Sequence, residues 1–390
     1  MKLPVYLDNN ATTPCDPRVL EAMLPWFTEK FGNASSSSHQ YGWEAEEAVK
    51  IGREQVASMI GAEPKEIIFT SGATESDNLA IKGVYEMFAG KGNHIITVAT
   101  EHKAVLDTCH ELEKKGAEIT WLHVNRDGLI NLEEMEASIT SQTILISVMY
   151  ANNETGVIQP IREISAIAKK HGVIFFTDAT QAVGKWPVHV RDDGIDLLAL
   201  SAHKLYGPKG QGALYIRRKN PRVRLAAQMN GGNHEMGFRS GTLNVPGIVG
   251  LGKACEIAAG NMDQEIASLE LMRDFLESSL LSLPGCGRNG SSLYRLSHVS
   301  NLRFANSVAA DLMTRLNKDI AVSSGSACSS STPEPSHVLM AMGLTESEAH
   351  ASIRFSLGRY TTREDVEYAV LKIRGELEKL HNESLKVSGT

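Results

Sequence analysis

The sequence predicts an α/β protein whose large domain carries a mainly parallel sheet and is followed by a smaller α+β domain. Through the first two-thirds of the chain, short β-rich runs alternate with helical patterns, which is the order of a parallel α/β sheet. Several of the β-rich runs are continuously apolar, as strands covered on both faces are. After about residue 255 the alternation stops and longer helical segments take over. The 390 residues are enough for both domains.

Six segments are predicted as strands of the large domain, because each is short, apolar and bounded by helical patterns or turns. They are Ile67–Thr70, His94–Ala99, Ile144–Tyr150, Ile174–Thr177, Leu197–Leu200 and Ala213–Ile216. Ligands of such sheets bind beyond the carboxyl ends of the strands. The polar residues that follow these runs are therefore the first candidates for a functional site.

Helical patterns with clear ends lie between and after the strands. In Ala45–Ile60, small or apolar residues recur with a 3.6-residue period, and Gly61 supplies a C-terminal stop. Ile161–Lys170 repeats this scheme and ends in basic residues that suit the negative end of the helix dipole. Asn261–Leu283 and the charged segment Thr362–Leu380 are predicted as helices of the smaller domain.

The domain boundaries follow from this change of pattern. We expect a large cofactor-binding domain at residues 16–255 and a small domain at residues 256–390. Residues 1–15 are too short for a domain of their own, so we expect them to join the small domain and to pack near the active site.

Composition and charge exclude several classes of protein. The net charge of −7 gives no reason to expect direct nucleic-acid binding, and no apolar run approaches the ~20 residues that a membrane span needs. The charged Asp8 comes too early for a secretory signal, so a cytoplasmic protein is expected. The 5 scattered cysteines lack CxxC spacing, which favours reduced thiols over a disulfide framework or a zinc site, and no metal is expected.

Polar residues that complement one another follow three of the predicted strands. Residues 71–76, Ser-Gly-Ala-Thr-Glu-Ser, offer backbone N–H groups and hydroxyls to an anion, although helix capping alone would explain them. Asp178 either caps a turn or keeps a heterocyclic nitrogen protonated. Lys204 is either a surface lysine or, if partly buried, a lysine whose lowered pKa suits a Schiff base.

The combination of the three is more specific than any one of them. A phosphorylated pyridine aldehyde requires an anion cradle for its phosphate, a carboxylate for its ring nitrogen and an amine for its aldehyde. Successive strand ends supply all three here. The sequence therefore predicts a pyridoxal 5'-phosphate site.

In these residues the sequence resembles the cysteine desulfurases, which are fold-type I pyridoxal-phosphate enzymes of the class V aminotransferase-like group. The matching motifs occur in order between about residue 5 and about residue 375. They are Leu7–Thr13, Thr70–Asn78, Thr100–His102, Asn152–Gly156, Asp178–Gln181, Ser201–Lys204 with the Gly-Pro-Lys-Gly that follows, and Arg239–Thr242. The resemblance implies a seven-stranded, mainly parallel sheet in the large domain.

The resemblance assigns catalytic roles to Lys204, Cys328 and His102. Lys204 would carry the cofactor as a Schiff base and later move protons. Asp178 would pair with the ring nitrogen, Gln181 would contact the ring hydroxyl, and His102 would stack on the ring.

The phosphate and the substrate receive their residues in the same way. Ala73, Thr74, Ser201 and His203 would hold the phosphate. The partner subunit's Thr242 would reach it as well, which implies a homodimer. The substrate-binding residues would be Asn153, near the ring and the substrate carboxylate, and Arg354, on the α-carboxylate of L-cysteine.

Cys328 stands in a small, polar, proline-punctuated stretch at residues 323–336, whose composition predicts a mobile exposed loop. We interpret the other cysteines, Cys15, Cys109, Cys255 and Cys286, as ordinary buried hydrophobic residues. The resemblance implies that Cys328 takes the sulfur of L-cysteine as a persulfide, leaves L-alanine, and passes the sulfur to acceptor proteins such as an iron–sulfur scaffold. Attack requires the thiolate, and His102 or the substrate amine could accept the proton. The long loop resembles the subgroup of iron–sulfur and nitrogenase-type desulfurases.

Two other functions stay open at this point. A related pyridoxal-phosphate enzyme, such as a selenocysteine lyase or an aminotransferase, would share most of the site. A non-catalytic sulfur-relay subunit would need only Cys328, and the presence of Lys204, Asp178 and His102 speaks against it.

One basic stretch, Arg217–Arg224, has two interpretations. On charge pattern alone it is a solvated loop after a strand. In similar enzymes the region that matches Arg222 and Arg224 forms a basic surface where acidic accessory proteins dock.

Overall fold

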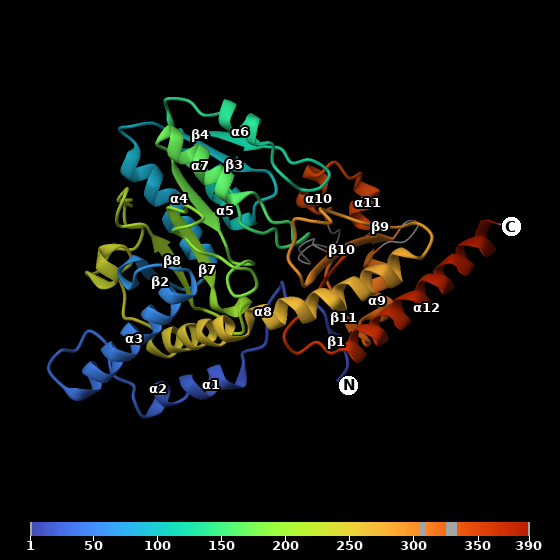
Figure 1. Cartoon of the computed structure of the whole chain (residues 1–390), viewed down its shortest axis with the longest axis horizontal. Coiled ribbons are helices and arrows are strands. Elements are labelled where there is room, and N and C mark those ends of the chain that lie inside the picture. Colours follow the sequence, from blue (N-terminus) through green and yellow to red (C-terminus); the bar gives the residue numbers. More distant parts are fainter. Residues whose placement is uncertain (1, 305–308, 325–333, 389–390) are drawn as a thin grey trace.

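The computed structural model describes residues 2–304, 309–324 and 334–388, with side chains as far as residue 380. At its centre lies a twisted sheet of seven strands (Figure 1). In spatial order they are β2 (Ile67–Thr70), β8 (Gly212–Ile216), β7 (Leu197–Ser201), β6 (Ile174–Asp178), β5 (Thr143–Ser147), β3 (His94–Val98) and β4 (Glu118–Leu122). β8 is antiparallel to both of its neighbours, and the other six strands run in one direction.

All six predicted strands are confirmed, and the mainly parallel sheet with them. The sequence missed β4, which lies at the edge of the sheet and pairs only with β3. Its residues are mostly half-exposed, so they lack the continuous apolar run by which the buried strands were found.

Helices cover both faces of this sheet. α4 (Ala73–Phe88) and α5 (Lys103–Glu113) enclose one apolar cluster against one face. The other face packs against α3 (Gln40–Met59), α6 (Leu132–Ala137), α7 (Ile161–His171) and the first part of α8 (Val245–Leu281), with α1 (Pro17–Met23) outside α8. The large part of the molecule is thus a three-layer α/β/α structure.

The predicted helix ends are confirmed at two glycines with positive φ. Gly61 (φ 68°) follows α3, and a Cβ there would lie 2.2 Å from the ring of His189. Gly172 (φ 66°) ends α7 in the left-handed conformation, directly after Lys169, Lys170 and His171. Both helices therefore stop where the sequence indicated.

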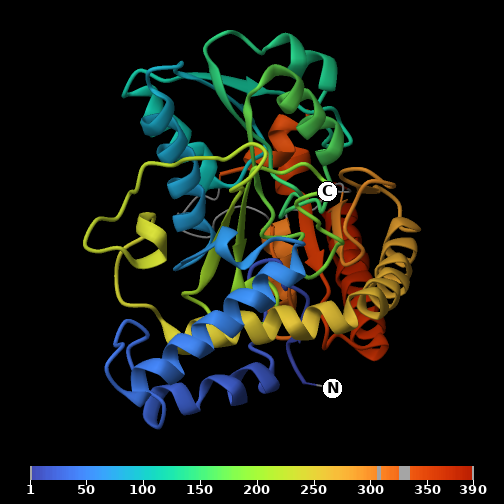
Figure 2. The same ribbon diagram turned by 60° about the vertical axis from the view of Figure 1, so that its left-hand side comes forward.

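The C-terminal part forms a second, smaller layer structure (Figure 2). Its three-stranded antiparallel sheet has the order β12 (Ser352–Ser356), β10 (Val299–Phe304), β9 (Cys286–Arg288), and the short β1 (Val5–Tyr6) pairs in parallel with β11 (Ile320–Ala321). The helices here are α9 (Ala309–Leu316), α10 (His337–Ala341), α11 (Glu346–His350) and α12 (Arg363–Ser388). The remaining short elements are α2 (Pro25–Thr28), η1 (Pro64–Glu66), η2 (Ala202–Lys204) and η3 (His234–Gly237).

α8 is the element that departs most from the prediction. The sequence indicated a helix at Asn261–Leu283, whereas α8 begins at Val245, where Asn244 caps it, and runs without interruption to Leu281. Its first part contributes Ile248 and Leu251 to the core of the large sheet. Its last part contributes Leu269 and Leu276 to the core of the small sheet. One helix is therefore shared by two hydrophobic cores.

The cysteines differ in exposure. Cys109 and Cys255 are fully buried, as predicted, and burial raises the pKa of each thiol to about 12. Cys286 is half-buried, and Cys15 is exposed, so the prediction of burial is wrong for Cys15. Within the described ranges, no helix has both the length and the apolar character of a membrane span, and no cluster of His, Cys, Asp and Glu could hold a metal ion.

Candidate active site

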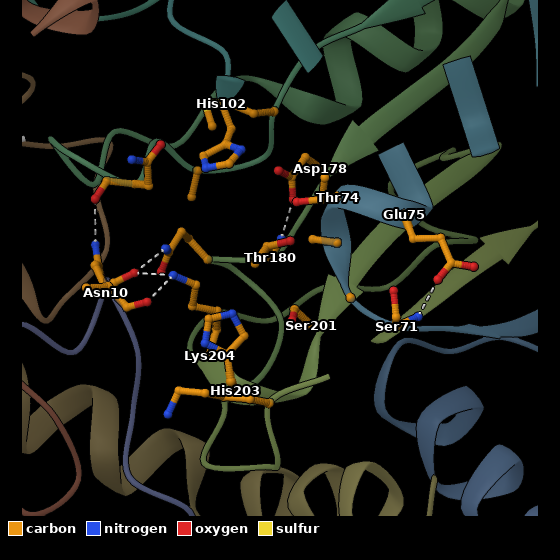
Figure 3. Close-up of a pocket in the computed structure, with 18 of the residues that line it drawn as sticks. Asn10, Ser71, Thr74, Glu75, His102, Asp178, Thr180, Ser201, His203 and Lys204 are labelled. Atoms are coloured by element: carbon orange, nitrogen blue, oxygen red, sulfur yellow. Dashed lines mark hydrogen bonds between the residues drawn. The ribbon is translucent and has the colours of Figure 1, made fainter. Parts of the chain in front are cut away.

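A cavity of about 570 Å³ opens at the carboxyl ends of the central strands (Figure 3). It lies where β2, β6 and β7 end, which is the place that the sheet topology predicts. Ten of the predicted site residues line it. They are Ala73, Thr74, His102, Asn153, Asp178, Gln181, Ser201, His203, Lys204 and Arg354.

One wall of the cavity is an anion cradle. The first N–H groups of α4, at Ala73 and Thr74, find no acceptor among the described residues, so they stay open at the positive end of a 16-residue helix. A Cβ on Gly72 would lie 3.7 Å from Ser201 Oγ, so this turn and the end of β7 face the same space. His203 lies beside them, and burial together with the charge of Lys204 lowers the pKa of its imidazole to about 4.

Lys204 lies on another wall of the cavity, at the end of the short helix η2 that follows β7. Its Nζ donates hydrogen bonds to two backbone carbonyls, those of Asn10 at 2.5 Å and Ala11 at 2.7 Å. Burial, and then the positive charge of Arg354, lower the pKa of Lys204 to about 8, against the opposing effect of Asp178 and Asp8. A desolvated amine of this kind is a nucleophile near neutral pH.

Asp178 lies at the end of β6, where its Oδ1 accepts a hydrogen bond from the Thr180 N–H at 2.9 Å. Two further acidic side chains, Asp77 and Glu101, are buried behind it and do not line the cavity. Burial raises the pKa of both well above the usual value, and the charge of Asp178 adds to the shift. Burial thus disfavours the charged form of both, and Asp178 is the one of these three acidic side chains that lines the cavity.

His102 forms the rim of the cavity on the side opposite Lys204, as Figure 3 shows. It is the N-cap of α5, and its Nδ1 accepts a hydrogen bond from the Ala104 N–H at 3.1 Å. In the neutral ring the proton must therefore sit on Nε2. His102 thus presents a ring face and an Nε2–H group, and it could act as a base only after exchanging that hydrogen bond.

Arg354 comes from β12 of the small sheet and is 5% exposed. One terminal nitrogen donates to Asp8 Oδ1 at 2.6 Å and the other to the Asn153 carbonyl at 3.0 Å. Its Nε is buried and has no hydrogen-bond partner among the described residues, although the side chain lines the cavity. A buried donor without an acceptor favours a ligand that carries one.

Two of the predicted site residues are not brought to this cavity. Thr242 is exposed and lies outside its lining. Cys328 lies outside the described residues. The structure adds Asn10, Ser71, Glu75, Met149, Thr180 and Lys209 to the lining, with small residues beside them. All of these six except Met149 stand within matching motifs of the sequence, which was the available signal for them.

The donor set fits pyridoxal phosphate. The open N-terminus of α4 suits a phosphate, the Asp178 carboxylate suits a protonated ring nitrogen, and the Lys204 amine suits an aldehyde. Thr180 also lines the cavity, and its buried Oγ1 has no hydrogen-bond partner among the described residues, which a polar ligand would satisfy.

Comparisons with known proteins agree with this chemistry. The family model Aminotransferase class-V matches residues 5–369. The chain is 54% identical over 385 residues to "Cysteine desulfurase IscS" of Anaeromyxobacter sp. (strain K), a match that covers 98% of this chain and 95% of that protein. It is 51% identical over 384 residues to the protein of the same name from Klebsiella pneumoniae (strain 342), again covering 98% and 95%.

Solved structures give the same answer. A "NifS-like protein" superimposes with a TM-score of 0.90 at 39% identity, covering 96% of this chain and 99% of that one. "SspA in complex with cysteine" superimposes with a TM-score of 0.80 at 39% identity, covering 92% and 99%. The chain therefore belongs to the class-V aminotransferases and, within them, to the cysteine desulfurases.

Proposed function

We propose that the cavity at Lys204 is where this pyridoxal-phosphate-dependent enzyme converts L-cysteine to L-alanine, and that Cys328 receives the sulfur as a persulfide. One observation carries the proposal: a single cavity joins a desolvated lysine, a carboxylate and an open helix N-terminus. Membership of the cysteine desulfurases supports the reaction. A similar structure is named as a complex with cysteine, which supports the substrate.

The protein's part in holding the cofactor follows from the walls of the cavity. Bound pyridoxal phosphate supplies an electron-withdrawing ring that accepts the electron pair left when the substrate loses its Cα proton. Lys204 would hold the aldehyde carbon and Asp178 the ring N–H. Ala73, Thr74, Ser201 and His203 would hold the phosphate, His102 would cover one ring face, and Gln181 would face the ring oxygen; all six line the cavity.

Substrate orientation falls to Arg354 and Asn153. The guanidinium of Arg354, whose buried Nε has no hydrogen-bond partner among the described residues, would bind the α-carboxylate. The hydrogen bonds to Asp8 and to the Asn153 carbonyl hold the guanidinium in place. The substrate amine would then lie on the side of Lys204, which is freed to carry the Cα proton.

The sulfur step balances without an outside oxidant. The Cys328 thiol loses its proton and forms an S–S bond to the substrate sulfur, while the substrate C–S bond breaks and its electron pair stays on the carbon side. Protons then complete the methyl group of alanine. One thiol and one cysteine become one persulfide and one alanine.

Product and mass analysis test this proposal. Wild-type enzyme with L-cysteine should release alanine and carry one additional sulfur on Cys328. Cys328→Ala should keep the yellow bound cofactor and lose the persulfide, and Lys204→Ala should lose the normal cofactor absorbance. Cys15→Ala is the matched control, because Cys15 is an exposed cysteine away from the cavity. Full sulfur transfer by Cys328→Ala, or a keto acid in place of alanine, would overturn the assignment.

We also propose a homodimer in which the partner subunit's Thr242 completes the phosphate site. In support, Thr242 is exposed and does not line the cavity of its own chain. Mixing Thr242→Ala with Lys204→Ala in equal amounts tests this, because a mixed dimer would hold one site with both residues intact. About a quarter of all sites should then regain wild-type activity. No recovery after subunit exchange would contradict the shared site.

Sulfur-acceptor proteins such as an iron–sulfur scaffold are the proposed partners, with an acidic one docking at Arg222 and Arg224. Both arginines are exposed, whereas Arg217 and Lys219 of the same stretch pair with Asp196 and Glu63. Charge reversal of the two arginines should weaken binding of the acceptor and its salt dependence, while alanine formation continues. A cytoplasmic location of the protein is also proposed. In support, the four described cysteines are free thiols, which a reducing compartment maintains.

The division into residues 16–255 and residues 1–15 with 256–390 remains our proposal for the domains. In support, Val5 and Leu7 of the N-terminal segment share an apolar cluster with residues that begin at Leu269. Because the boundary at residue 255 lies inside α8, the two proposed domains share this helix.

A further inference from the structure

Lys185 is a lysine beside the cavity that none of the steps above uses. It follows β6 by a short turn, is partly buried, and forms no ion pair with a carboxylate of the described residues. Two cations, Lys204 and Arg354, lie near it. Burial first, and then these two positive charges, lower the pKa of Lys185 to about 7. A cation placed among cations without a counter-ion costs free energy, so its single hydrogen bond is informative.

That hydrogen bond goes to Gln181, which lines the cavity and is 4% exposed. Lys185 Nζ donates to Gln181 Oε1 at 3.1 Å. At the other end of the amide, Gln181 Nε2 donates to the Asn10 carbonyl at 3.0 Å, the same carbonyl that accepts from Lys204. With Lys185 protonated, a flipped amide would set Nε2 against the ammonium and Oε1 against the Asn10 carbonyl, so both contacts would become repulsive.

Asn10 itself is fixed by its side chain. Asn10 Nδ2 donates to the Asn153 carbonyl at 3.0 Å, so Oδ1 must be the acceptor for His298 Nε2 at 2.9 Å. Burial lowers the pKa of His298 and so disfavours the charged ring, and the hydrogen bond to Asn10 Oδ1 places a proton on Nε2. The Asn10 carbonyl is thus a rigid acceptor, and one N–H of Gln181 Nε2 is left over for the cavity.

We propose that Lys185 is a positioning residue that holds the Gln181 amide with its NH₂ group, rather than its oxygen, toward the bound cofactor. The inference rests on the proposed function, in which the ring oxygen of pyridoxal phosphate accepts from Gln181. With Lys185 in place, the cavity presents a donor that stabilises this oxygen as an anion. Without it, one of the two contacts that select the amide orientation is lost, and a carbonyl oxygen can face the anion instead.

The test is a double-mutant cycle of Lys185→Met and Gln181→Leu, with the pH midpoint of the visible absorbance of the bound cofactor as the readout. Lys185→Met should raise this midpoint by about one pH unit, because one hydrogen bond to a charged oxygen is weakened. It should lower kcat about fivefold with KM for L-cysteine within about twofold, since Lys185 does not touch the substrate. In the Gln181→Leu background the same substitution should move the midpoint by less than half as much.

Three comparisons make the result specific. Lys185→Arg, which keeps a donor, should restore the midpoint, and Lys169→Met should change nothing because Lys169 is exposed on α7. The cofactor-free Lys185→Met protein should unfold at the wild-type temperature or above, because an unpaired cation has been removed. Equal midpoint shifts in the two Gln181 backgrounds, or a loss of stability without a spectral shift, would overturn the inference. Wild-type protein that forms no alanine from L-cysteine would instead refute the proposed function.

Discussion

The lowered pKa of Lys204 makes a quantitative prediction for the cofactor-free enzyme. An ordinary lysine has a pKa of 10.5, and Lys204 has one of about 8. At pH 7 about 9% of Lys204 side chains would then be neutral, against about 0.03% for an ordinary lysine. Lys204 should therefore react with a small acylating reagent about 300-fold more readily at neutral pH than an exposed lysine of equal intrinsic reactivity.

The assay is competitive acylation of the cofactor-free protein across a pH series, with the extent at each lysine read by mass spectrometry. The midpoint for Lys204 should lie near pH 8, and Lys169 on the surface serves as the internal reference. Two substitutions of neighbours should move it in opposite directions. Arg354→Gln removes a cation and should raise the midpoint, and Asp178→Asn removes an anion and should lower it. A midpoint of about 10 or above, or shifts in the same direction, would refute the reasoning.

The same shift links protonation to folding. Because the pKa of Lys204 falls on folding, the unfolded state binds more protons than the native state between about pH 8 and pH 10.5. The contribution of Lys204 to the free energy of unfolding of the cofactor-free protein should therefore rise with pH across this window. Lys204→Met should abolish this part of the pH dependence, which denaturant unfolding at several pH values would measure.

Three further predictions concern other parts of the molecule. Arg354→Lys keeps the charge but loses the fork, so KM for L-cysteine in steady-state kinetics should rise about 10- to 100-fold with a smaller change in kcat. Glu277→Ala should lower the free energy of unfolding by about 3–5 kcal/mol in denaturant titrations, because Arg295, whose side chain is 7% exposed, keeps only its longer contact with Asp274 among the described carboxylates. Gly260→Ala should raise that free energy by about 0.5–1 kcal/mol in the same titrations, because Gly260 lies inside α8 and an added Cβ would meet nothing within 4 Å.

The sequence predicted the buried strands well because a strand that is buried on both faces has a continuously apolar sequence. β7 is buried at every position and reads as a continuous apolar run, whereas β4 at the sheet edge is not and was missed. The start of α8 was missed for a different reason. Its glycines allow close helix packing: a Cβ on Gly252 would lie 2.7 Å from the Cα of Gly52 on α3. Tertiary contact requires glycine there, although helix propensity argues against it.

The site likewise has a part that the sequence predicts and a part that it does not. Asp178, Lys204 and the turn before α4 could be placed together because strand direction brings their strand ends to one edge of the sheet. The position of Asn10 depends on how the N-terminal segment crosses that edge, and the contact between Lys185 and Gln181 depends on the shape of one turn. Hydrophobic periodicity and motif spacing predict neither the position of Asn10 nor the contact between Lys185 and Gln181. Such contacts require the folded backbone.

The continuity of α8 sets a mechanical condition on catalysis. At 1.5 Å per residue its 37 residues form a rod of about 55 Å, so a tilt of one degree displaces its far end by about 1 Å. Lys204 follows β7, which packs in the core at one end of α8, and Arg354 lies on β12, which packs in the core at the other end. α8 is thus one of the elements that set the distance between the amine and the guanidinium, and a partner protein that displaces the small sheet would change that distance.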